Sequence, residues 1–313
     1  MEKKVTKKEH PDFLWLDGQI IPWDEATVHI TALEWGAVAS VYEGIRAYHH
    51  PDTGPLYLFR LDDHLARFAD SMKMMRMDPA FSPQGLKEAI LALLQANHIK
   101  DDAYIRPFAF FEEVYPFYPS PKMAPTHILI TSRPFGSRLK TGYELHCRIS
   151  SWTRISDNVM PPRAKAVANY QNSWLATTEA GLDGYGSAIL LNERGKVSEG
   201  PGACLMLVRQ DKVITPPVTS GILESITRLT LIRLLREVLG MEVVEREVDR
   251  TELYVAQEAF FCGTAQEISP IVSVDRLPVG DGEVGPLTKK LIDLYHDLVR
   301  GIDERYPEWR TPV

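Results

Sequence analysis

The spacing of apolar residues predicts several strands in the first part of the chain. FLWL and QIIP flank Asp17-Gly18 and predict a β-hairpin, because Asp-Gly adopts the tight turn that joins two antiparallel strands. VYEGIRAY, from about Tyr42, and GPLYLFRL, ending near Arg60, are typical of strands. AYIRPFAFF and THILITS predict two more. These strands form most of the first part of the predicted fold.

Helical spacing predicts three helices among these strands. A short one covers about 33–40. The second follows Arg60, with apolar residues at helical spacing at Leu65, Phe68, Met72 and Met75. The third begins at Pro83 with Ser82 as a plausible N-cap. Its apolar stripe is Leu86, Ile90, Leu93 and Leu94.

Strands dominate the second half of the pattern. LHCRISSW, SAILLNE, KVSEG, ACLMLVR and KVITPP are predicted strands, with tight polar turns at 193–195 and 210–212. Helices are expected at about 169–180, 226–239 and 286–299, the last two ended by Gly240 and Gly301. The 226–239 helix has an apolar face of Ile226, Leu229, Ile232, Leu235 and Leu239. Strands interrupted by helices, without strict alternation, predict an α+β or mixed α/β fold.

Two segments suggest how the chain is organised. SRPFGSRLKTG has the glycine, proline and basic content of a connection between domains. We therefore predict a small N-terminal α/β domain over 1–132, an interdomain loop over 133–142 and a larger C-terminal domain over 143–313. FEEVYPFYPSPKMAP is rich in proline and aromatic residues. It is either a solvent loop or a loop that contacts substrate or a dimer partner.

Charge and composition exclude several classes of function. The net charge of −7 argues against nucleic acid or an anionic membrane as the main partner. The charged start, MEKKVTKKEHPD, lacks the apolar core of a secretory signal, and no apolar run approaches the about 18–20 residues of a membrane helix. Three widely spaced cysteines argue against disulfides and against a structural zinc site. A cytoplasmic location without a metal site is expected.

Four short motifs carry the chemistry. Lys165 in AKAVANY, Glu199 in VSEGPG, the ESITR turn and CGTAQE follow one another in the second half. Together they supply an amine for a Schiff base, a carboxylate for a pyridine nitrogen and two backbone cradles for a phosphate. Pyridoxal 5'-phosphate needs these partners for its aldehyde, its ring nitrogen and its phosphate. Each motif alone is weak evidence, because a lone lysine or a Glu-Gly turn is usually a solvated surface feature.

The individual motifs strengthen this prediction. Small apolar neighbours around Lys165 favour a neutral, nucleophilic amine. Glu199 against the ring nitrogen would keep that nitrogen protonated, so that the ring accepts electrons. The first N–H groups of the helix that begins at ESITR have no intrahelical acceptor, which makes this end a natural seat for phosphate.

The YIRP and YEGIR segments are candidate substrate sites. Alternate residues of a strand share a face, so Tyr104 lies beside Arg106, and Tyr42 and Gly44 share a face with Arg46. Arginine matches a carboxylate bidentately, and Gly44 would leave room for a ligand. An ion pair between strands is the alternative for Arg106.

Two other motifs do not support a function of their own. GDGEVG at 280–285 matches GxGxxG, but its acidic residues would repel a pyrophosphate and no strand leads into it. Asp62-Asp63-His64 resembles a set of metal ligands, but it begins an amphipathic helix whose N-terminal dipole favours acidic residues.

From about Phe13 to Arg310 the chain resembles the fold-type IV aminotransferases, and the branched-chain amino acid aminotransferases most closely. This resemblance implies that Lys165 forms the Schiff base and shuttles the proton, that Tyr170 binds the phenolic oxygen and that Glu199 binds the ring nitrogen. It also implies further cofactor ligands and a set of substrate residues. The cofactor ligands are Arg60, Leu223, Ile226, Thr227 and Thr264, and the substrate residues are Tyr42, Gly44, Tyr104, Arg106, Thr264 and Ala265.

The resemblance further implies a barrel-like C-terminal domain, pyridoxal phosphate between the domains, and at least a homodimer whose second subunit closes the pocket. The chain departs from the family at Ala203-Cys204, where Glu-Asn is typical, and at Arg133-Pro134-Phe135, where F-P-W is common. Glu224-Ser225 replaces the usual Pro-Gly, and the segment around Trp35 is two residues longer. These departures leave the substrate range open.

The expected function is transamination of branched-chain L-amino acids with 2-oxoglutarate. A transaminase of (R)-primary amines or D-amino acids is the enzymatic alternative. A homologue without turnover is the other alternative, against which the complete set of Lys165, Glu199 and Arg60 argues.

Overall fold

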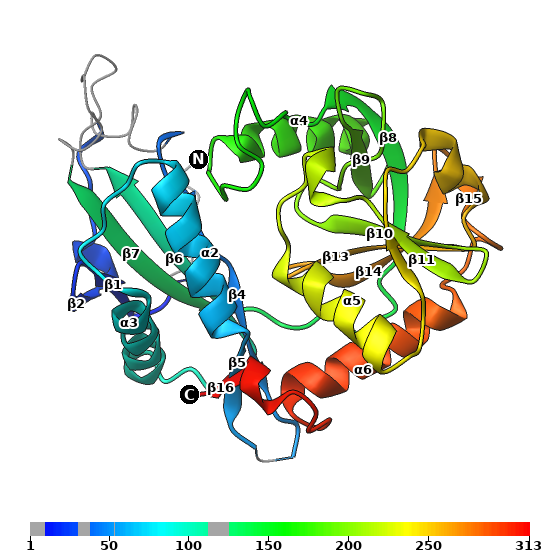
Figure 1. Cartoon of the computed structure of the whole chain (residues 1–313). Coiled ribbons are helices and arrows are strands. Elements are labelled where there is room, and N and C mark those ends of the chain that lie inside the picture. Colours follow the sequence, from blue (N-terminus) through cyan, green and yellow to red (C-terminus); the bar gives the residue numbers. More distant parts are fainter. Residues whose placement is uncertain (1–9, 31–37, 53, 112–124) are drawn as a thin grey trace, which may run out of the picture. The chain divides into compact units, whose positions relative to one another are not determined.

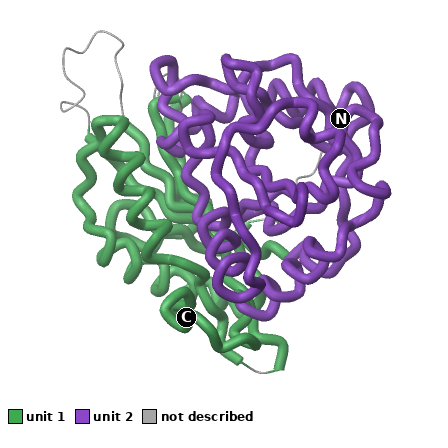
Figure 2. The backbone as a smooth tube through the Cα atoms, turned by 45° about the vertical axis from the view of Figure 1, so that its right-hand side comes forward, with its two compact units in different colours: residues 1–136, 299–313 green, residues 137–298 purple. Residues whose placement is uncertain are grey.

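The chain folds into two compact units of mixed α/β structure. The structure is a computed structural model, and it describes residues 10–30, 38–52, 54–111 and 125–313. One unit contains Met1–Gly136 and Val299–Val313, and the other contains Ser137–Leu298 (Figure 2). The predicted mixed fold class is confirmed. The domain division predicted from sequence, at 1–132, 133–142 and 143–313, stays a prediction.

The first unit is built on an antiparallel sheet. In the described part of the chain its order is β16-β5-β4-β6-β7-β1-β2, and β3 pairs with β6 (Figure 1). The strands are β1 (Phe13–Leu16), β2 (Gln19–Pro22), β3 (Val41–Tyr42), β4 (Ile45–His49), β5 (Leu56–Phe59), β6 (Ala103–Phe111), β7 (Thr126–Pro134) and β16 (Arg310–Pro312). The β1–β2 hairpin is confirmed, with Asp17 and Gly18 at φ of 46° and 97°.

Two helices cover one face of this sheet (Figure 1). They are α2 (Leu61–Met74) and α3 (Pro83–Ala96), and the predicted cap of α3 is present because the Gly85 N–H donates to Ser82 Oγ at 3.2 Å. Burial alternates along β6, so that Ala103, Ile105 and Ala109 lie in the core. The intervening residues of β6, among them Tyr104 and Arg106, therefore lie on the opposite face.

The second unit is built on a sheet of order β12-β11-β10-β13-β14-β8-β9 among the described residues, with β15 beside β14 (Figure 1). Its strands are β8 (Leu145–Thr153), β9 (Ser187–Leu191), β10 (Cys204–Arg209), β11 (Lys212–Thr215), β12 (Val243–Glu245), β13 (Glu258–Gly263), β14 (Glu267–Val274) and β15 (Leu277–Pro278). The helices are α4 (Asn169–Leu182), α5 (Ile226–Glu237) and α6 (Pro286–Arg300). Short 3-10 helices occur in this unit at Val218–Ser220 and Arg250–Val255, and in the first unit at Trp23–Glu25 and Pro307–Trp309.

Two predictions about the second unit are wrong. KVSEG is not a strand, because Val197 bridges to Leu191 while Lys196 bridges to Asp249, and these single bridges form no continuous ladder. Leu229 does not belong to the buried face of α5, since it is 50% exposed. The buried face of α5 includes Arg228 instead, which is 2% exposed.

The interior position of Arg228 has a polar cause. Its Nε donates to Thr215 Oγ1 at 3.0 Å, and its Nη2 donates to Pro216 O and Glu245 Oε2, both at 2.9 Å. A buried guanidinium is stable when its N–H groups are paired in this way.

Some predicted features lie outside the described residues. These are most of the predicted helix at 33–40, including Trp35, and the proline- and aromatic-rich loop at 112–124. Within the described residues, no helix is both long and apolar enough to cross a membrane.

Candidate active site

Lys165 lies on an irregular segment directly before α4. Its neighbours Ala164 and Ala166 are 1% and 0% exposed, so the segment is packed into the unit on both sides of the lysine. Asn169, at the start of α4, donates from Nδ2 to Pro161 O and Ala164 O, both at 3.0 Å. These two hydrogen bonds hold the segment against the helix and so fix the backbone that carries Lys165.

The Lys165 side chain meets Tyr170, as the sequence predicts. Nζ of Lys165 donates to the Tyr170 hydroxyl at 2.6 Å and lies 5.1 Å from the centre of its ring. The pair brings an amine and a phenol to one point. A group with an aldehyde beside a phenolic oxygen would find a nucleophile and a hydrogen-bond partner there.

Glu199 is the buried carboxylate of the site, with 4% of the residue exposed. Its Oε1 lies 2.8 Å from Nη2 of Arg154, and its Oε2 accepts from the Leu223 backbone N–H at 3.2 Å. The thiol of Cys204 lies 3.8 Å from Oε2. The carboxylate is therefore anchored by three groups from different parts of the unit.

The charge of Glu199 reflects two opposing effects. Burial raises the pKa of the Glu199 carboxyl above its ordinary value, while Arg154, the Leu223 N–H and Lys165 act in the opposite direction. Lys165 is thus one of the positive charges that act on the Glu199 carboxyl. A cationic ring nitrogen beside Glu199 would add a further opposite charge and favour the ionised carboxylate.

Glycines allow the backbone to come close around Glu199. A Cβ on Gly200 would lie 2.7 Å from the Phe261 ring, so a larger residue cannot fit without a shift. Gly221 has a φ of 82°, and its carbonyl accepts from Nε of Arg154 at 3.3 Å. The two glycines thus bring Glu199 against β13 and hold Arg154 beside it.

The start of α5 lies close to the Glu199 carboxylate. Leu223, which donates to Glu199, leads into the helix, and Ser225 caps it by accepting from the Arg228 N–H at 3.2 Å. Ile226 and Thr227 are its first residues. Their N–H groups have no carbonyl four residues earlier within the helix, and the helix dipole favours an anion at this end.

Thr264 and Ala265 lie on the turn between β13 and β14. The turn ends at Glu267, which has a φ of 54° and accepts from Ser137 Oγ at 2.9 Å and from the Arg138 N–H at 2.7 Å. At the other end, a Cβ on Gly263 would lie 3.2 Å from Gly202 O. The turn is therefore fixed next to the loop that carries Glu199.

The predicted substrate residues of the first unit share one face of its sheet. Tyr42 pairs with Phe108 and Arg46 pairs with Tyr104, so Gly44 lies between them opposite Arg106. A Cβ on Gly44 would lie 1.8 Å from the Tyr104 hydroxyl. The space that Gly44 leaves is therefore taken by this hydroxyl rather than left open for a ligand.

Beneath this face, Glu43 is held by a buried cluster. Its carboxylate receives a hydrogen bond from Arg67 Nε at 2.7 Å and lies 2.8 Å from His64 Nδ1. Burial by itself would raise the pKa of Glu43, but Arg67 and His64 outweigh it and hold this pKa far below its ordinary value. The cluster ties the link between β3 and β4, and with it Tyr42 and Gly44, to α2.

Arg60 also belongs to the first unit. It has a φ of 53° at the N-terminus of α2, its Nε donates to Asp63 at 2.8 Å, and its guanidinium lies 4.9 Å from the centre of the Trp309 ring. Its assignment to a phosphate stays a prediction.

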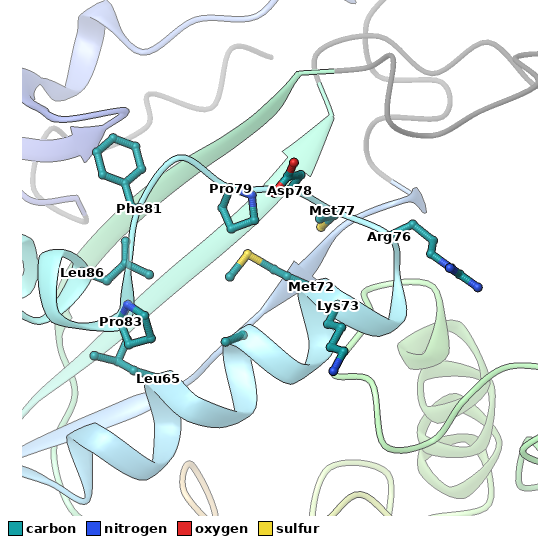
Figure 3. Close-up of a pocket in the computed structure, with 11 residues that line it drawn as sticks. Leu65, Met72, Lys73, Arg76, Met77, Asp78, Pro79, Phe81, Pro83 and Leu86 are labelled. Atoms are coloured by element: carbon teal, nitrogen blue, oxygen red, sulfur yellow. The ribbon is translucent and has the colours of Figure 1, made fainter.

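A cavity of about 620 Å³ in the first unit contains none of the predicted site residues. Leu65, Met72, Met77 and Leu86 line it, and Figure 3 shows Lys73 and Arg76 extending away from it. Lys73, Arg76 and Asp78 are the charged residues at its edge, and none of them belongs to the predicted site.

The structure brings two pairs of the residues predicted in the second half of the chain into contact. Lys165 contacts Tyr170, and Glu199 contacts Leu223 directly before α5. Sequence reasoning missed Arg154 and Glu43. No spacing signal marks either residue, because their partners lie far away in the chain. Of Arg154 and its partner Glu199, the family motif contains only Glu199.

The donor set fits pyridoxal phosphate. Lys165 offers an amine, Tyr170 a phenol, Glu199 an anchored carboxylate and the start of α5 a seat for an anion.

Several known proteins are similar to this chain over most of its length. The family model for amino-transferase class IV matches residues 40–274. A probable branched-chain-amino-acid aminotransferase of Aquifex aeolicus is 39% identical over 99% of both chains, and the branched-chain-amino-acid aminotransferase of Escherichia coli is 38% identical over 99% of both. The branched-chain amino acid aminotransferase of Thermobaculum terrenum, solved in its PLP form, superposes with a TM-score of 0.94 at 49% identity and covers 97% of this chain and 99% of its own.

A match of this extent, together with relatives similar over their whole length, identifies the family. The chain belongs to the class IV aminotransferases.

Proposed function

We propose that the protein is a pyridoxal-phosphate-dependent aminotransferase that transfers amino groups between branched-chain L-amino acids (leucine, isoleucine and valine) and 2-oxoglutarate. The observation that carries the proposal is the Lys165–Tyr170 contact at 2.6 Å beside the buried, arginine-paired Glu199. The relatives named above support the choice of substrate, because their names specify branched-chain amino acids.

Four site residues of the second unit have distinct roles in this reaction. Bound pyridoxal phosphate supplies a ring that accepts electrons when a substrate loses its α-proton. Lys165 holds the cofactor and then moves the proton at the α-carbon. Tyr170 keeps the amine of Lys165 oriented through their hydrogen bond. Glu199 holds a proton on the ring nitrogen, and Arg154 favours the ionised carboxylate against the opposing effect of burial.

The remaining cofactor residues hold the phosphate and the ring. The N–H groups of Ile226 and Thr227 at the start of α5 suit a phosphate. Thr264 would add a hydroxyl and Arg60 a permanent charge, and Leu223 would pack on the ring. These assignments rest on the family motif and the positions given above.

The substrate residues are proposed to bind the α-carboxylate and the side chain of the substrate. Thr264 and Ala265 present backbone amides on a rigid turn, which suits the α-carboxylate. Tyr42, Gly44 and Tyr104 shape the side-chain site, and Arg106 takes the second carboxylate of 2-oxoglutarate. A cytoplasmic homodimer or a higher homo-oligomer completes the proposal.

A panel of half-reactions tests the function. The holoenzyme is mixed with L-leucine, D-alanine or (R)-1-phenylethylamine, and bleaching of the cofactor absorbance band is followed. The proposal expects rapid bleaching with L-leucine. Faster bleaching with D-alanine or the (R)-amine would assign the protein to the alternative transaminase classes, and no bleaching with any donor would indicate a homologue without turnover.

A further inference from the structure

Two exposed arginines lie side by side on the open face of the first unit's sheet. In the β6–β7 ladder, Tyr104 pairs with Arg133 and Arg106 pairs with Thr131. Arg106 and Arg133 are therefore diagonal neighbours on one face. Diagonal neighbours in an antiparallel pair are about 7–8 Å apart, within reach of long side chains.

Aromatic rings support both guanidiniums. The guanidinium carbon of Arg106 lies 4.6 Å from the centre of the Tyr42 ring and 5.4 Å from that of Phe108. That of Arg133 lies 5.6 Å from the Tyr104 ring and 4.9 Å from the Phe135 ring. Contact with a ring face fixes the side chain but uses none of the N–H donors of the guanidinium.

Phe135 is itself held in place. Arg46, which is 1% exposed, donates from Nη2 to Phe135 O at 3.0 Å, and its guanidinium lies 4.7 Å from the Phe135 ring. The ring under Arg133 is thus fixed from below by a second, buried cation.

Neither exposed arginine pairs with a carboxylate of the residues that the structure describes. Arg106 and Arg133 form no ion pair and no hydrogen bond with a residue in the described part of the chain. Other arginines of the same unit do have such partners, in the pairs Arg60–Asp63, Arg67–Glu43, Arg300–Asp102 and Arg305–Asp303. Towards the described residues, the N–H donors of Arg106 and Arg133 are therefore available on one face, and planar guanidiniums suit a carboxylate.

We propose that Arg133 is a specificity-determining residue that, together with Arg106, binds the distal carboxylate of a dicarboxylate substrate. This inference rests on the proposed function, in which 2-oxoglutarate and a branched-chain amino acid use the same site. The rings of Tyr42, Tyr104, Phe108 and Phe135 offer apolar surface to a branched side chain, and the two guanidiniums offer donors to a carboxylate. Arg133 therefore favours the dicarboxylate and contributes little to the branched substrate.

Three variants test the proposal in the holoenzyme. Arg133→Gln removes the charge while keeping a polar side chain, and Arg133→Lys keeps the charge but loses the planar fork. Arg276→Gln is the matched control, because Arg276 is also exposed and its guanidinium lies 5.7 Å from the ring of Tyr185. Both glutamine variants change the net charge equally, so a difference between them reports on position.

Two measurements are made on each protein. One is the half-reaction kcat/KM for L-glutamate and L-leucine, and the other is the Kd of glutarate, a dicarboxylate without an amino group, from calorimetry. We expect Arg133→Gln to lower kcat/KM for glutamate and to weaken glutarate about 10-fold to 100-fold, the effect of one charged hydrogen-bond pair. Leucine should change by less than about 3-fold, Arg133→Lys should recover part of the loss, and Arg276→Gln should match the wild type.

Other outcomes overturn the inference. An equal loss for glutamate and leucine would mean that Arg133 supports the sheet, and unchanged glutarate binding would remove it from substrate recognition. Failure of the proposed function would look different, because the wild type itself would then not react with L-leucine. The glutarate measurement still decides the role of Arg133 in that case.

Discussion

Arg154 and Glu199 form an ion pair of 2.8 Å between Nη2 and Oε1, with side chains 7% and 6% exposed. Arg154 follows β8, whereas Glu199 belongs to the loop before β10. The pair holds the carboxylate in one orientation and favours its ionised form. The pair therefore fixes the position of the Glu199 carboxylate and partly offsets the effect of burial on its pKa.

Lys165→Ala should abolish covalent attachment of the cofactor while leaving phosphate binding in place. The variant has no amine at this position, so borohydride treatment should fix no pyridoxal phosphate to the peptide that contains residue 165. Turnover should be nearly lost, since the group that moves the proton is absent. Peptide mass spectrometry after reduction checks this, with the wild type as the positive control. Cofactor fixed to the same peptide in the variant would contradict the assignment.

Glu199→Gln should lower kcat on the order of 10²-fold or more, because it removes a main electrostatic contribution without changing shape. The protonation of the ring nitrogen can be followed by nitrogen NMR of labelled cofactor. Glu193→Gln, in an exposed turn, is a suitable control. A nitrogen signal that is the same in wild type and Glu199→Gln would remove Glu199 from this role.

Arg154→Leu should move the acid limb of the kcat–pH profile to higher pH. Arg154 lowers the pKa of Glu199 against the opposing effect of burial, so its loss raises that pKa further. Glu199 then stays protonated up to a higher pH, and the activity of the variant should recover as pH rises. The limb should be absent in Glu199→Gln. If kcat falls at every pH while the acid limb stays at the same pH, Arg154 acts on the fold alone.

Arg106→Leu should weaken carboxylate-bearing side chains selectively, by roughly 2–4 kcal/mol in transition-state binding, about what the loss of a charged hydrogen-bond pair costs. The half-reaction kcat/KM is measured for L-glutamate, L-leucine and (R)-1-phenylethylamine. The amine has no carboxylate and should be affected least. Equal losses for all three donors would show that Arg106 supports the sheet instead.

Glu43→Gln should destabilise the protein by about 3–5 kcal/mol near neutral pH, because it breaks a buried charge cluster with Arg67 and His64. The pKa of Glu43 is lowered in the folded state from an ordinary value of 4.5. The contribution of Glu43 is therefore complete above that value and is lost as the pH falls towards the folded pKa. The difference between wild type and variant should shrink by about 1.4 kcal/mol per pH unit below 4.5. Urea unfolding at pH 7 and pH 3 measures it, and a difference independent of pH would contradict this account.

Sequence patterns predicted the elements whose cause is local. The β1–β2 hairpin depends on Asp17-Gly18, and α3 begins where Ser82 can cap it. The contact between Lys165 and Tyr170 joins residues that are five positions apart at the start of one helix. In each case the interacting residues are neighbours in the chain, so spacing and residue type are sufficient.

Tertiary structure decided the features that depend on distant partners. Arg154 gains its role from Glu199, and Glu43 from His64 and Arg67 on α2, and no short pattern connects these residues. Leu229 was predicted to be buried, but Arg228 takes the interior position because Thr215, Pro216 and Glu245 satisfy its N–H groups.

The chain by itself therefore determined which chemical groups are present, in which order, and on which local elements. Only the fold decided which of these groups become buried and paired. The physical reason is that the pKa of a carboxyl such as Glu199 depends on its burial and on the charges around it, and both arise from segments that are far apart in sequence.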